Sequence, residues 1–123
     1  MLTRLAVVAM LVTGSALAQA PTKPPFDPVG RWRMHHTDGS EFAARLAADQ
    51  TATTNFGGGE RGIWRWEGAK VRVMYTDGWD DLLSLEPEGK YTKGGWSPGL
   101  DRCGPAANQT AAEHISPDPG PPL

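Results

Sequence analysis

His36, Tyr75 and Asp81 are side chains of types that move protons near neutral pH in a chain of 123 residues. An imidazole oriented by a carboxylate is the usual proton shuttle of an enzyme. The same residues can equally form a hydrogen-bonded group at the end of a strand, with no catalytic role. We favour this second interpretation, in which the three residues have a structural role. A small enzyme that uses them is kept as a second alternative for the function.

Metal binding and phosphate binding are weakly supported by the sequence. His35 and His36 are adjacent, and adjacent strand residues face opposite ways, so both imidazoles rarely reach one ion together with Asp38. The aspartates of residues 77–81 lack the regular oxygen spacing of a calcium loop. The glycines of residues 57–59 are followed by no lysine and no helix, unlike a phosphate-binding loop. We therefore expect no metal and no cofactor.

Five tryptophans are many for so short a chain, and they suggest either a ligand surface or a well-filled core. Indole faces stack on sugars, phenolics and cations, and the ring N–H is left for a polar contact. Small β-barrels also need large side chains to fill them. Alternation along the strands turns polar residues inward at His36, Asn55, Tyr75 and Asp81. The predicted ligand-binding residues are Trp32, His36, Trp64, Trp66, Tyr75, Trp79 and Asp81.

Charge excludes two classes of partner. The chain has 12 Lys and Arg against 14 Asp and Glu, a formal net charge of −2. Nucleic-acid binders and binders of anionic membranes need a basic face. We expect neither as a partner. A small-molecule ligand or a periplasmic protein stays possible, and the oligomeric state is left open.

The start of the chain has the pattern of a signal peptide. Arg4 precedes the apolar stretch Leu5 to Val12, and small residues follow up to Ala18. The apolar stretch is about half of the roughly 20 residues that a membrane-spanning helix needs. We predict cleavage after Ala18, no membrane association after removal of residues 1–18, and a periplasmic or secreted protein in a bacterium. The single cysteine, Cys103, then has no internal partner.

Prolines divide the remaining chain into three parts. Ten of the 11 prolines precede residue 29 or follow residue 97. We predict a proline-rich lead-in over 19–28, one β-barrel domain over 29–98, and a mostly disordered proline-rich tail over 99–123. The tail has room for a short helix around residues 106–114.

Within the central part, apolar and polar residues alternate with a period of two. Trp32 and Met34 alternate with charged residues, as do Trp64 and Trp66. Glycines preceded by acidic residues separate the runs, as tight hairpins require. The pattern predicts no helix in this part and seven strands, near residues 30–37, 40–47, 51–56, 62–67, 69–76, 79–86 and 90–96.

The central part also repeats itself. Gly30-Arg31-Trp32 recurs as Gly62-Ile63-Trp64, an offset of 32 (62 − 30 = 32), and Thr37-Asp38-Gly39 recurs as Thr76-Asp77-Gly78, an offset of 39 (76 − 37 = 39). We interpret the seven-residue difference as a hairpin arm, residues 66–72, inserted in the second copy. Chance similarity between hairpins is the alternative.

Seven short strands with an aromatic face are best covered by curling into a barrel. We predict an all-β protein, a small antiparallel up-and-down meander barrel of about seven to eight strands. The Gly30-Arg31-Trp32 entry to the first strand resembles the glycine-x-tryptophan motif of the calycins, the group of lipocalins, avidins and small bacterial protease-inhibitor barrels. The rest of the lipocalin pattern and an avidin biotin pocket are missing.

Membership of the calycins would imply ligand binding at the open end of the barrel, or inhibition of a secreted protease. A barrel this small is nearly filled by its own side chains, so any site is a shallow one at the mouth. The preferred function is an exported module that binds a small, partly apolar ligand there. A protein-interaction or protease-inhibitor barrel is the alternative.

Overall fold

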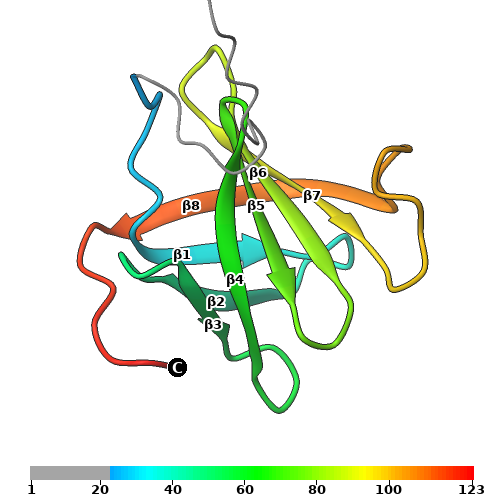
Figure 1. Cartoon of the computed structure of the whole chain (residues 1–123), viewed down its shortest axis with the longest axis horizontal. Coiled ribbons are helices and arrows are strands. Elements are labelled where there is room, and N and C mark those ends of the chain that lie inside the picture. Colours follow the sequence, from blue (N-terminus) through cyan, green and yellow to red (C-terminus); the bar gives the residue numbers. More distant parts are fainter. Residues whose placement is uncertain (1–22) are drawn as a thin grey trace, which may run out of the picture.

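The structure, a computed structural model, describes residues 23–123. The predicted signal peptide, residues 1–18, lies outside the described residues. Residues 23–123 form an all-β closed barrel of eight antiparallel strands in meander order, in which β8 returns to pair with β1 (Figure 1). No helix in this part of the chain is long and apolar enough to cross a membrane. The strands are β1 (Gly30–His35), β2 (Glu41–Leu46), β3 (Thr51–Thr54), β4 (Glu60–Glu67), β5 (Lys70–Tyr75), β6 (Asp80–Leu85), β7 (Tyr91–Trp96) and β8 (Asn108–Ser116).

The fold class and the seven predicted strands are confirmed, but the predicted tail is wrong. β8 lies inside it and pairs with both β1 and β7, so the barrel domain does not end at residue 98 and residues 106–114 are not a helix. The side chains that β8 turns inward are small or polar, such as Thr110 and Ala112. A hydrophobicity pattern therefore misses this strand, although its backbone closes the barrel.

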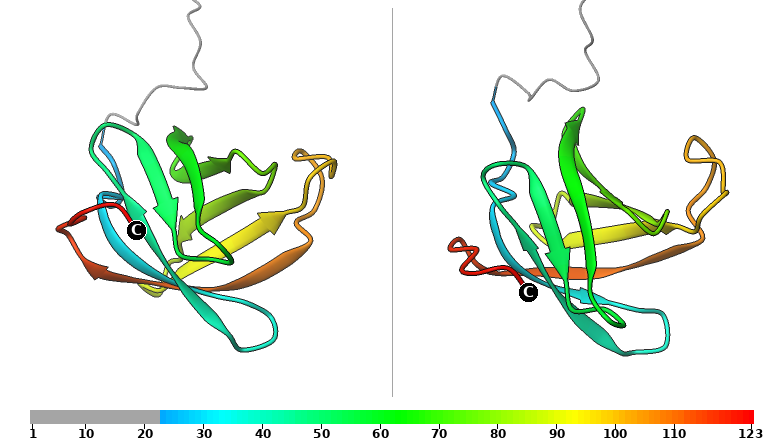
Figure 2. Two further views of the ribbon diagram at one scale, coloured as in Figure 1. Left: turned by 90° about the horizontal axis from the view of Figure 1, so that it is seen from below. Right: turned by 60° about the horizontal axis from the view of Figure 1, so that its bottom comes forward.

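The last residues of the chain fold back along the outside of the barrel. Arg31 donates a hydrogen bond from Nη2 to the Pro121 carbonyl at 2.7 Å, and Arg45 donates from Nε to the Gly120 carbonyl at 2.7 Å. Figure 2 shows this C-terminal segment on the opposite side of the barrel from the loop between β7 and β8. Side chains on strands β1 and β2 therefore hold residues 117–123 in place.

Four hairpin turns of the barrel share one hydrogen-bond pattern. In the turn of residues 36–40, the His36 N–H donates to the Ser40 carbonyl at 2.8 Å, and the Gly39 N–H donates to the His36 carbonyl at 3.1 Å. The turn of residues 75–79 repeats both bonds, at 2.9 and 3.1 Å, 39 positions later (75 − 36 = 39). The turns of residues 47–51 and 86–90 are related by the same offset (86 − 47 = 39) and form the same pair of bonds. Turns of this geometry thus recur at the predicted offset of 39, but all four share it, so a duplication stays a prediction beside chance similarity.

The offset of 32 has a different origin. Gly62 lies inside β4, the last strand of the first half. At the offset of 39, β1 corresponds to β5, which begins after the β4–β5 turn. Residues 66–72 are the end of β4, this turn and the start of β5, so the predicted inserted arm is wrong. A Cβ on Gly62 would lie 2.1 Å from the Met74 carbonyl oxygen of β5. Gly62 is thus required by a close approach of two strands, which explains why glycine precedes Trp64 there.

One end of the barrel is closed by aromatic side chains. Phe26, from the segment before β1, packs edge-on against Trp32, Trp66 and Tyr91, with ring centroids 5.3 to 6.3 Å apart. Trp32 also stacks on His114 at 4.3 Å with the rings 3° from parallel. These side chains seal the end at which the chain enters the barrel. A ligand site inside the barrel mouth must therefore use the other end.

Candidate functional site

The open end of the barrel carries a small pocket. In an antiparallel meander the loops after odd-numbered strands lie at one end, and here they are residues 36–40, 55–59, 76–79 and 97–107. The pocket has a volume of about 60 Å³. That is well below the roughly 300–1,000 Å³ of a typical drug-sized site, so it has room for one small chemical group. It is lined by His36, Phe42, Phe56, Glu60, Trp79, Asp81, Lys93 and Asn108.

Strand register places a charged pair on the inner wall of this pocket. Asp81 on β6 and Lys93 on β7 both belong to the inward-facing set, and only 5% and 3% of their surfaces are exposed. Lys93 Nζ lies 3.7 Å from Asp81 Oδ1, and the Tyr75 hydroxyl donates to Asp81 Oδ2 at 3.4 Å. Burial raises the pKa of Asp81 to about 6 and raises that of Tyr75, while Lys93 lowers the pKa of Asp81. Charge inside a barrel is costly unless it is paired.

Glu60, at the start of β4, is the second carboxylate in the pocket. Its Oε1 accepts a hydrogen bond from the Thr54 hydroxyl at 2.9 Å. Burial, and then the neighbouring carboxylate of Asp77, raises the pKa of Glu60 to about 7. Among the described residues, Glu60 has no ion pair with Lys, Arg or His. Glu60 is therefore partly protonated at neutral pH and is ready to meet a cation or a hydrogen-bond donor.

Aromatic rings form the opposite side of the pocket. The rings of His36, Phe42 and Phe56 lie 4.8 to 5.4 Å apart, centroid to centroid. Burial, and then the charge of Lys93, lowers the pKa of His36, so its imidazole is neutral at neutral pH. Phe56 is 43% exposed and precedes the glycines of residues 57–59, and a Cβ added at residue 57 or 58 would meet only open space. Phe56 is thus an exposed ring on an uncrowded loop above the pocket.

Two buried polar atoms at this end have no hydrogen-bond partner within residues 23–123. They are Nε2 of His36 and Oδ1 of Asn108. Oγ1 of Thr110, on the adjacent inner wall, is also buried without a hydrogen-bond partner among these residues. Buried polar atoms are nearly always paired, because an unpaired one loses its bond to water without replacement. Asn108 also fits against Gly95, where a Cβ would lie 2.6 Å from its Oδ1. The open end therefore presents polar groups that a bound molecule can satisfy.

The structure divides the predicted site residues into two groups. His36, Trp79 and Asp81 line the pocket, and Tyr75 contacts Asp81. Trp32, Trp64 and Trp66 belong to the core, with exposed fractions of 1 to 6%. The indoles of Trp32 and Trp64 donate to the carbonyls of Pro28 and Ala47 at 2.9 and 2.8 Å, so their polar atoms are already used. A ligand role for these three tryptophans stays a prediction, and their positions are explained by packing.

Asn55, predicted to face inward, is exposed, and its side chain accepts a hydrogen bond from the Ala43 N–H at 2.8 Å. The strand ends at Thr54, so alternation no longer applies to residue 55. The pocket residues that the sequence analysis missed include Glu60, Lys93 and Asn108. Lys93 had a usable signal, because it lies between Tyr91 and Gly95 on the inward positions of a predicted strand. Asn108 lies on the missed strand β8.

The predicted acid/base group is not assembled as a hydrogen-bonded unit. Tyr75 and Asp81 are in contact, but Nε2 of His36 has no partner among the described residues and no bond joins His36 to Asp81. A carboxylate that orients an imidazole must lie within hydrogen-bond reach of it. The described residues thus contain a Tyr75–Asp81 contact but no bonded His36–Asp81 pair.

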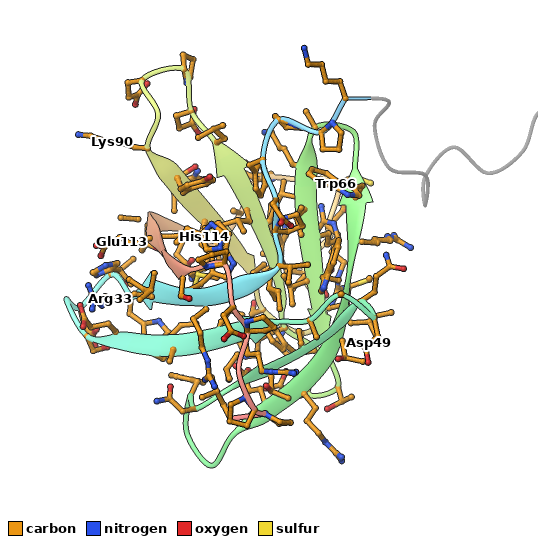
Figure 3. All side chains as sticks on the ribbon, turned by 90° about the vertical axis from the view of Figure 1, so that its left-hand side faces the viewer. Arg33, Asp49, Trp66, Lys90, Glu113 and His114 are labelled. Carbon is orange, nitrogen blue, oxygen red and sulfur yellow. The ribbon has the colours of Figure 1, made fainter. Side chains whose placement is uncertain are left out.

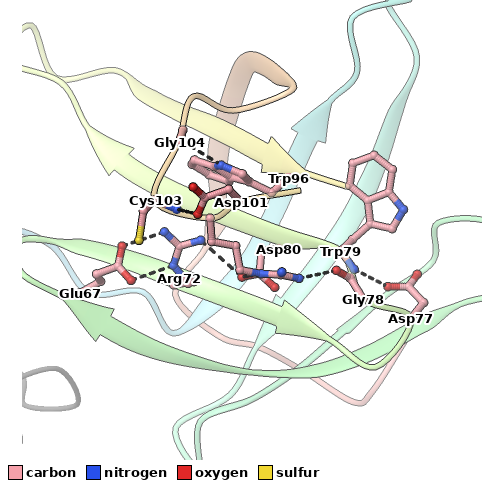
Figure 4. A network of polar contacts seen from close by, with 11 residues as sticks. Glu67, Arg72, Asp77, Gly78, Trp79, Asp80, Trp96, Asp101, Cys103 and Gly104 are labelled. Carbon is pink, nitrogen blue, oxygen red and sulfur yellow. Dashed lines mark hydrogen bonds and ion pairs between the residues drawn. The ribbon is translucent and has the colours of Figure 1, made fainter. Parts of the chain in front are cut away.

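A second polar cluster lies on the outside of the barrel. Asp80, 3% exposed, accepts from Arg72 Nη1 at 3.3 Å and from Arg102 of the loop between β7 and β8 (Figure 4). The guanidinium of Arg72 also lies 4.9 Å from the ring centroid of Trp96, whose indole donates to the Gly104 carbonyl at 3.2 Å. These contacts fix the loop against β5, β6 and β7. The cluster is satisfied internally, so we assign it a structural role.

The outer face of β1 and β8 carries a smaller polar cluster. Arg33 and Glu113 lie side by side there (Figure 3), with Nη1 and Oε2 3.4 Å apart. His35 reaches the other oxygen of Glu113 at 2.7 Å. Exposed ion pairs of this kind contribute little to stability, and they mark the solvent face of the strands.

Within residues 23–123, no three His, Cys, Asp or Glu side chains gather closely enough to hold a metal ion. Cys103 is exposed and unpaired in the same range. In the comparisons with known proteins, no family model, no curated protein and no solved structure matches this chain, so the fold and the pocket carry the argument about function.

Proposed function

We propose that this chain is an exported β-barrel module that binds a small, partly apolar ligand at its open end. The observation that carries the proposal is the pocket itself, with aromatic rings on one side and buried polar groups on the other. Ligand sites combine apolar walls with a few polar groups that orient the ligand.

The size of the pocket limits the ligand. About 60 Å³ accepts one polar head group, and the rest of the molecule would lie against the exposed ring of Phe56 and the partly exposed ring of Trp79. The ligand is therefore amphipathic, with a compact polar end and an apolar or aromatic end.

The composition of the inner wall supports a binding role over a purely structural one. A barrel that needs stability alone is best filled with apolar side chains, because buried ions and unpaired polar atoms cost free energy. The closed end follows this rule, with Phe26, Trp32 and Trp66. The open end departs from it with Asp81, Lys93 and Glu60. Departures of this kind are typical of functional sites.

The signal-peptide pattern and the resemblance to calycins fit this proposal. Export follows from the pattern of residues 1–18, and calycin-like barrels bind ligands at the open end. A fold alone does not specify a function. A protein-interaction or protease-inhibitor barrel is the alternative, and an enzyme using His36, Tyr75 and Asp81 is less favoured because His36 and Asp81 are not bonded.

The test is a titration followed by NMR of the tryptophan indole N–H groups, with phenol, benzyl alcohol, glucose and hexanoate as probes. Trp79 reports on the pocket, and Trp32 and Trp66 at the closed end serve as internal references. We expect a saturable shift at Trp79 for at least one probe, with much smaller shifts at the references. No shift for any probe, or equal shifts at all indoles, would contradict the proposal and favour the interaction alternative.

Two surface variants sharpen the test. Phe56→Ala removes the exposed ring above the pocket, and Ile63→Ala removes an exposed side chain, 55% accessible, on the outer face of β4. We expect Phe56→Ala to weaken binding several-fold and Ile63→Ala to leave it unchanged. Equal effects would mean that the probe does not bind at the pocket.

A further inference from the structure

We infer that the polar end of this ligand is a positively charged amine, received by Glu60 and Asp81 and by the aromatic rings of the open end. The inference rests on the proposed function and adds the chemical class of the ligand. Its basis is the charge, the hydrogen-bonding capacity and the ring geometry of the pocket.

The charges around the pocket are predominantly negative. Glu60 and Asp81 line it, and Asp38 and Asp77 lie close enough to influence His36 and Glu60. Lys93 is the cation that lines the pocket, and it is paired with Asp81. An anionic ligand would have to approach Glu60 without a free cation to receive it. Glu60 accepts a hydrogen bond from Thr54 but has no counter-ion among the described residues, and a cationic ligand supplies one.

The unpaired polar atoms also suit a donor. Oδ1 of Asn108 is an acceptor, and Nε2 of a neutral His36 is an acceptor when the proton is on Nδ1. An ammonium group has three N–H donors and no acceptor. Its three donors match in number the acceptors that these pocket-lining residues offer, the carboxylate of Glu60 and the two unpaired atoms.

The aromatic rings of the pocket can stabilise a cation further. Phe42, Phe56 and Trp79 line it, and ammonium groups are attracted to the faces of such rings within about 6 Å. Lys93 Nζ already lies 5.8 Å from the centroid of Phe42, so the barrel accommodates an ammonium against this wall. A metal ion fits less well, because the described residues hold no group of three or more metal-ligating side chains.

The protonation of Glu60 gives the inference a pH signature. Glu60 is faced by Thr54 of β3, Asp77 of the β5–β6 turn and Asp81 of β6, and His36 and Lys93 share its pocket. Its pKa of about 7 means that it is largely protonated at pH 6 and largely ionised at pH 8. An amine stays charged across this range, so its affinity should rise about five- to tenfold from pH 6 to pH 8.

The experiment uses three probes of similar size: benzylammonium, benzyl alcohol and benzoate. Binding is followed at the Trp79 indole N–H. We expect benzylammonium to bind at least tenfold more tightly than the other two at pH 8, with the stated rise from pH 6. Glu60→Gln should remove most of the preference and most of the pH dependence, the remainder coming from Asp81, and Glu88→Gln, on the exposed turn at the closed end, should change neither.

The outcomes distinguish a failure of the proposed function from a failure of the amine inference. If none of the three probes binds, the proposed function fails for this ligand class. If benzyl alcohol or benzoate binds as tightly as benzylammonium, the proposed function stands and the amine inference is overturned. The comparison of the three probes needs the unmodified protein alone, so it decides the inference even if Glu60→Gln fails to fold.

Discussion

Trp32 and His114 stack face to face inside the barrel, with ring centroids 4.3 Å apart and planes 3° from parallel. The two residues are register partners on β1 and β8, the first and last strands. The indole of Trp32 bonds to the Pro28 carbonyl, and the imidazole of His114 lies 3.1 Å from the Val29 carbonyl. The stacked rings of Trp32 and His114 thus join the segment that precedes β1 to β8, the last strand.

Deleting β8 should therefore prevent folding. A chain ending at residue 107 loses the stack and leaves unpaired edges on β1 and β7, which a barrel of this size cannot cover. We expect the truncated chain to lack a cooperative thermal transition and to aggregate, as measured by circular dichroism and light scattering.

The matched control is a chain ending at residue 116. It keeps β8 and loses the outer segment, whose contacts include the hydrogen bonds from Arg31 and Arg45. We expect it to fold, with a loss of about 1 to 2 kcal/mol for two exposed or partly buried bonds. A cooperative transition in the shorter chain would show that β8 is dispensable.

Trp32 should be a far larger contributor to stability than Trp79. Trp32 is 1% exposed and packs against Phe26, Tyr91 and His114, whereas Trp79 lies at the rim of the open end. Trp32→Ala should lower the free energy of unfolding by about 3 to 5 kcal/mol, as large-to-small substitutions of buried aromatics do. Trp79→Ala should cost about 1 kcal/mol. Urea denaturation measures both, and a loss below about 1 kcal/mol for Trp32→Ala would remove it from the core.

Much of the fold was predictable because its signals are local. Alternation around Trp32, Trp64 and Val73 marks buried faces, and the turn glycines mark hairpin ends. β8 was not predictable from this pattern, since Ala112 is the single buried apolar residue among its inward positions. Its pairing partners are β1 and β7, the first and last of the predicted strands, so no local pattern marks it.

The site was predictable in part for a related reason. His36 and Asp81 lie next to turns on inward positions, so their place at the mouth followed from alternation. Glu60 lies before the first tryptophan of β4, on an extension of that strand which the sequence pattern does not mark. Phe26 packs on Trp32 and Trp66 and so closes the end of the barrel where they lie. This is a tertiary contact, so the sequence pattern does not show which tryptophans face the open end.

The predicted offset of 39 relates inward positions of the two halves that carry different side chains. At the offset of 39, Tyr75, Asp81 and Lys93 take the positions that His36, Phe42 and Thr54 hold in the first half. The two halves share hairpin turns of one geometry, and the bounds of β2 and β6 coincide at this offset (41 + 39 = 80, 46 + 39 = 85). At these three positions the second half therefore supplies polar side chains to the open end, while Glu60 of β4 adds a carboxylate from the first half.

Asp80 should be important to stability although it lies outside the core. Its side chain is 4% exposed and accepts from both Arg72 and Arg102. Asp80→Asn leaves the buried guanidinium of Arg72 with Glu67 alone, and breaking a buried ion pair costs about 3 kcal/mol. Arg102→Ala removes a side chain that is 39% exposed and should cost about 1 kcal/mol or less. Thermal and urea denaturation decide the order, and equal losses would contradict the central role of Asp80.

The free energy of unfolding should also depend on pH through Glu60. Its pKa is about 7 in the folded protein against 4.5 in the unfolded chain, so the folded state binds the proton more tightly. Stability from this group is present below about pH 4.5 and is lost as the pH rises to about 7. Asp81 acts in the same direction between 3.8 and about 6.

Glu60→Gln isolates this effect, because glutamine is neutral at every pH and can still accept the hydrogen bond from Thr54. After allowance for the partial exposure of Glu60, we expect the variant to be more stable than the unmodified protein by about 1 to 2 kcal/mol at pH 8 and nearly equal at pH 4. Titrating groups far from Glu60 are common to both proteins and cancel in the difference, whereas Asp77 and Asp81 interact with Glu60 and contribute to it. Urea denaturation at the two pH values measures it, and a difference that stays constant between pH 4 and pH 8 would show that Glu60 titrates normally in the fold.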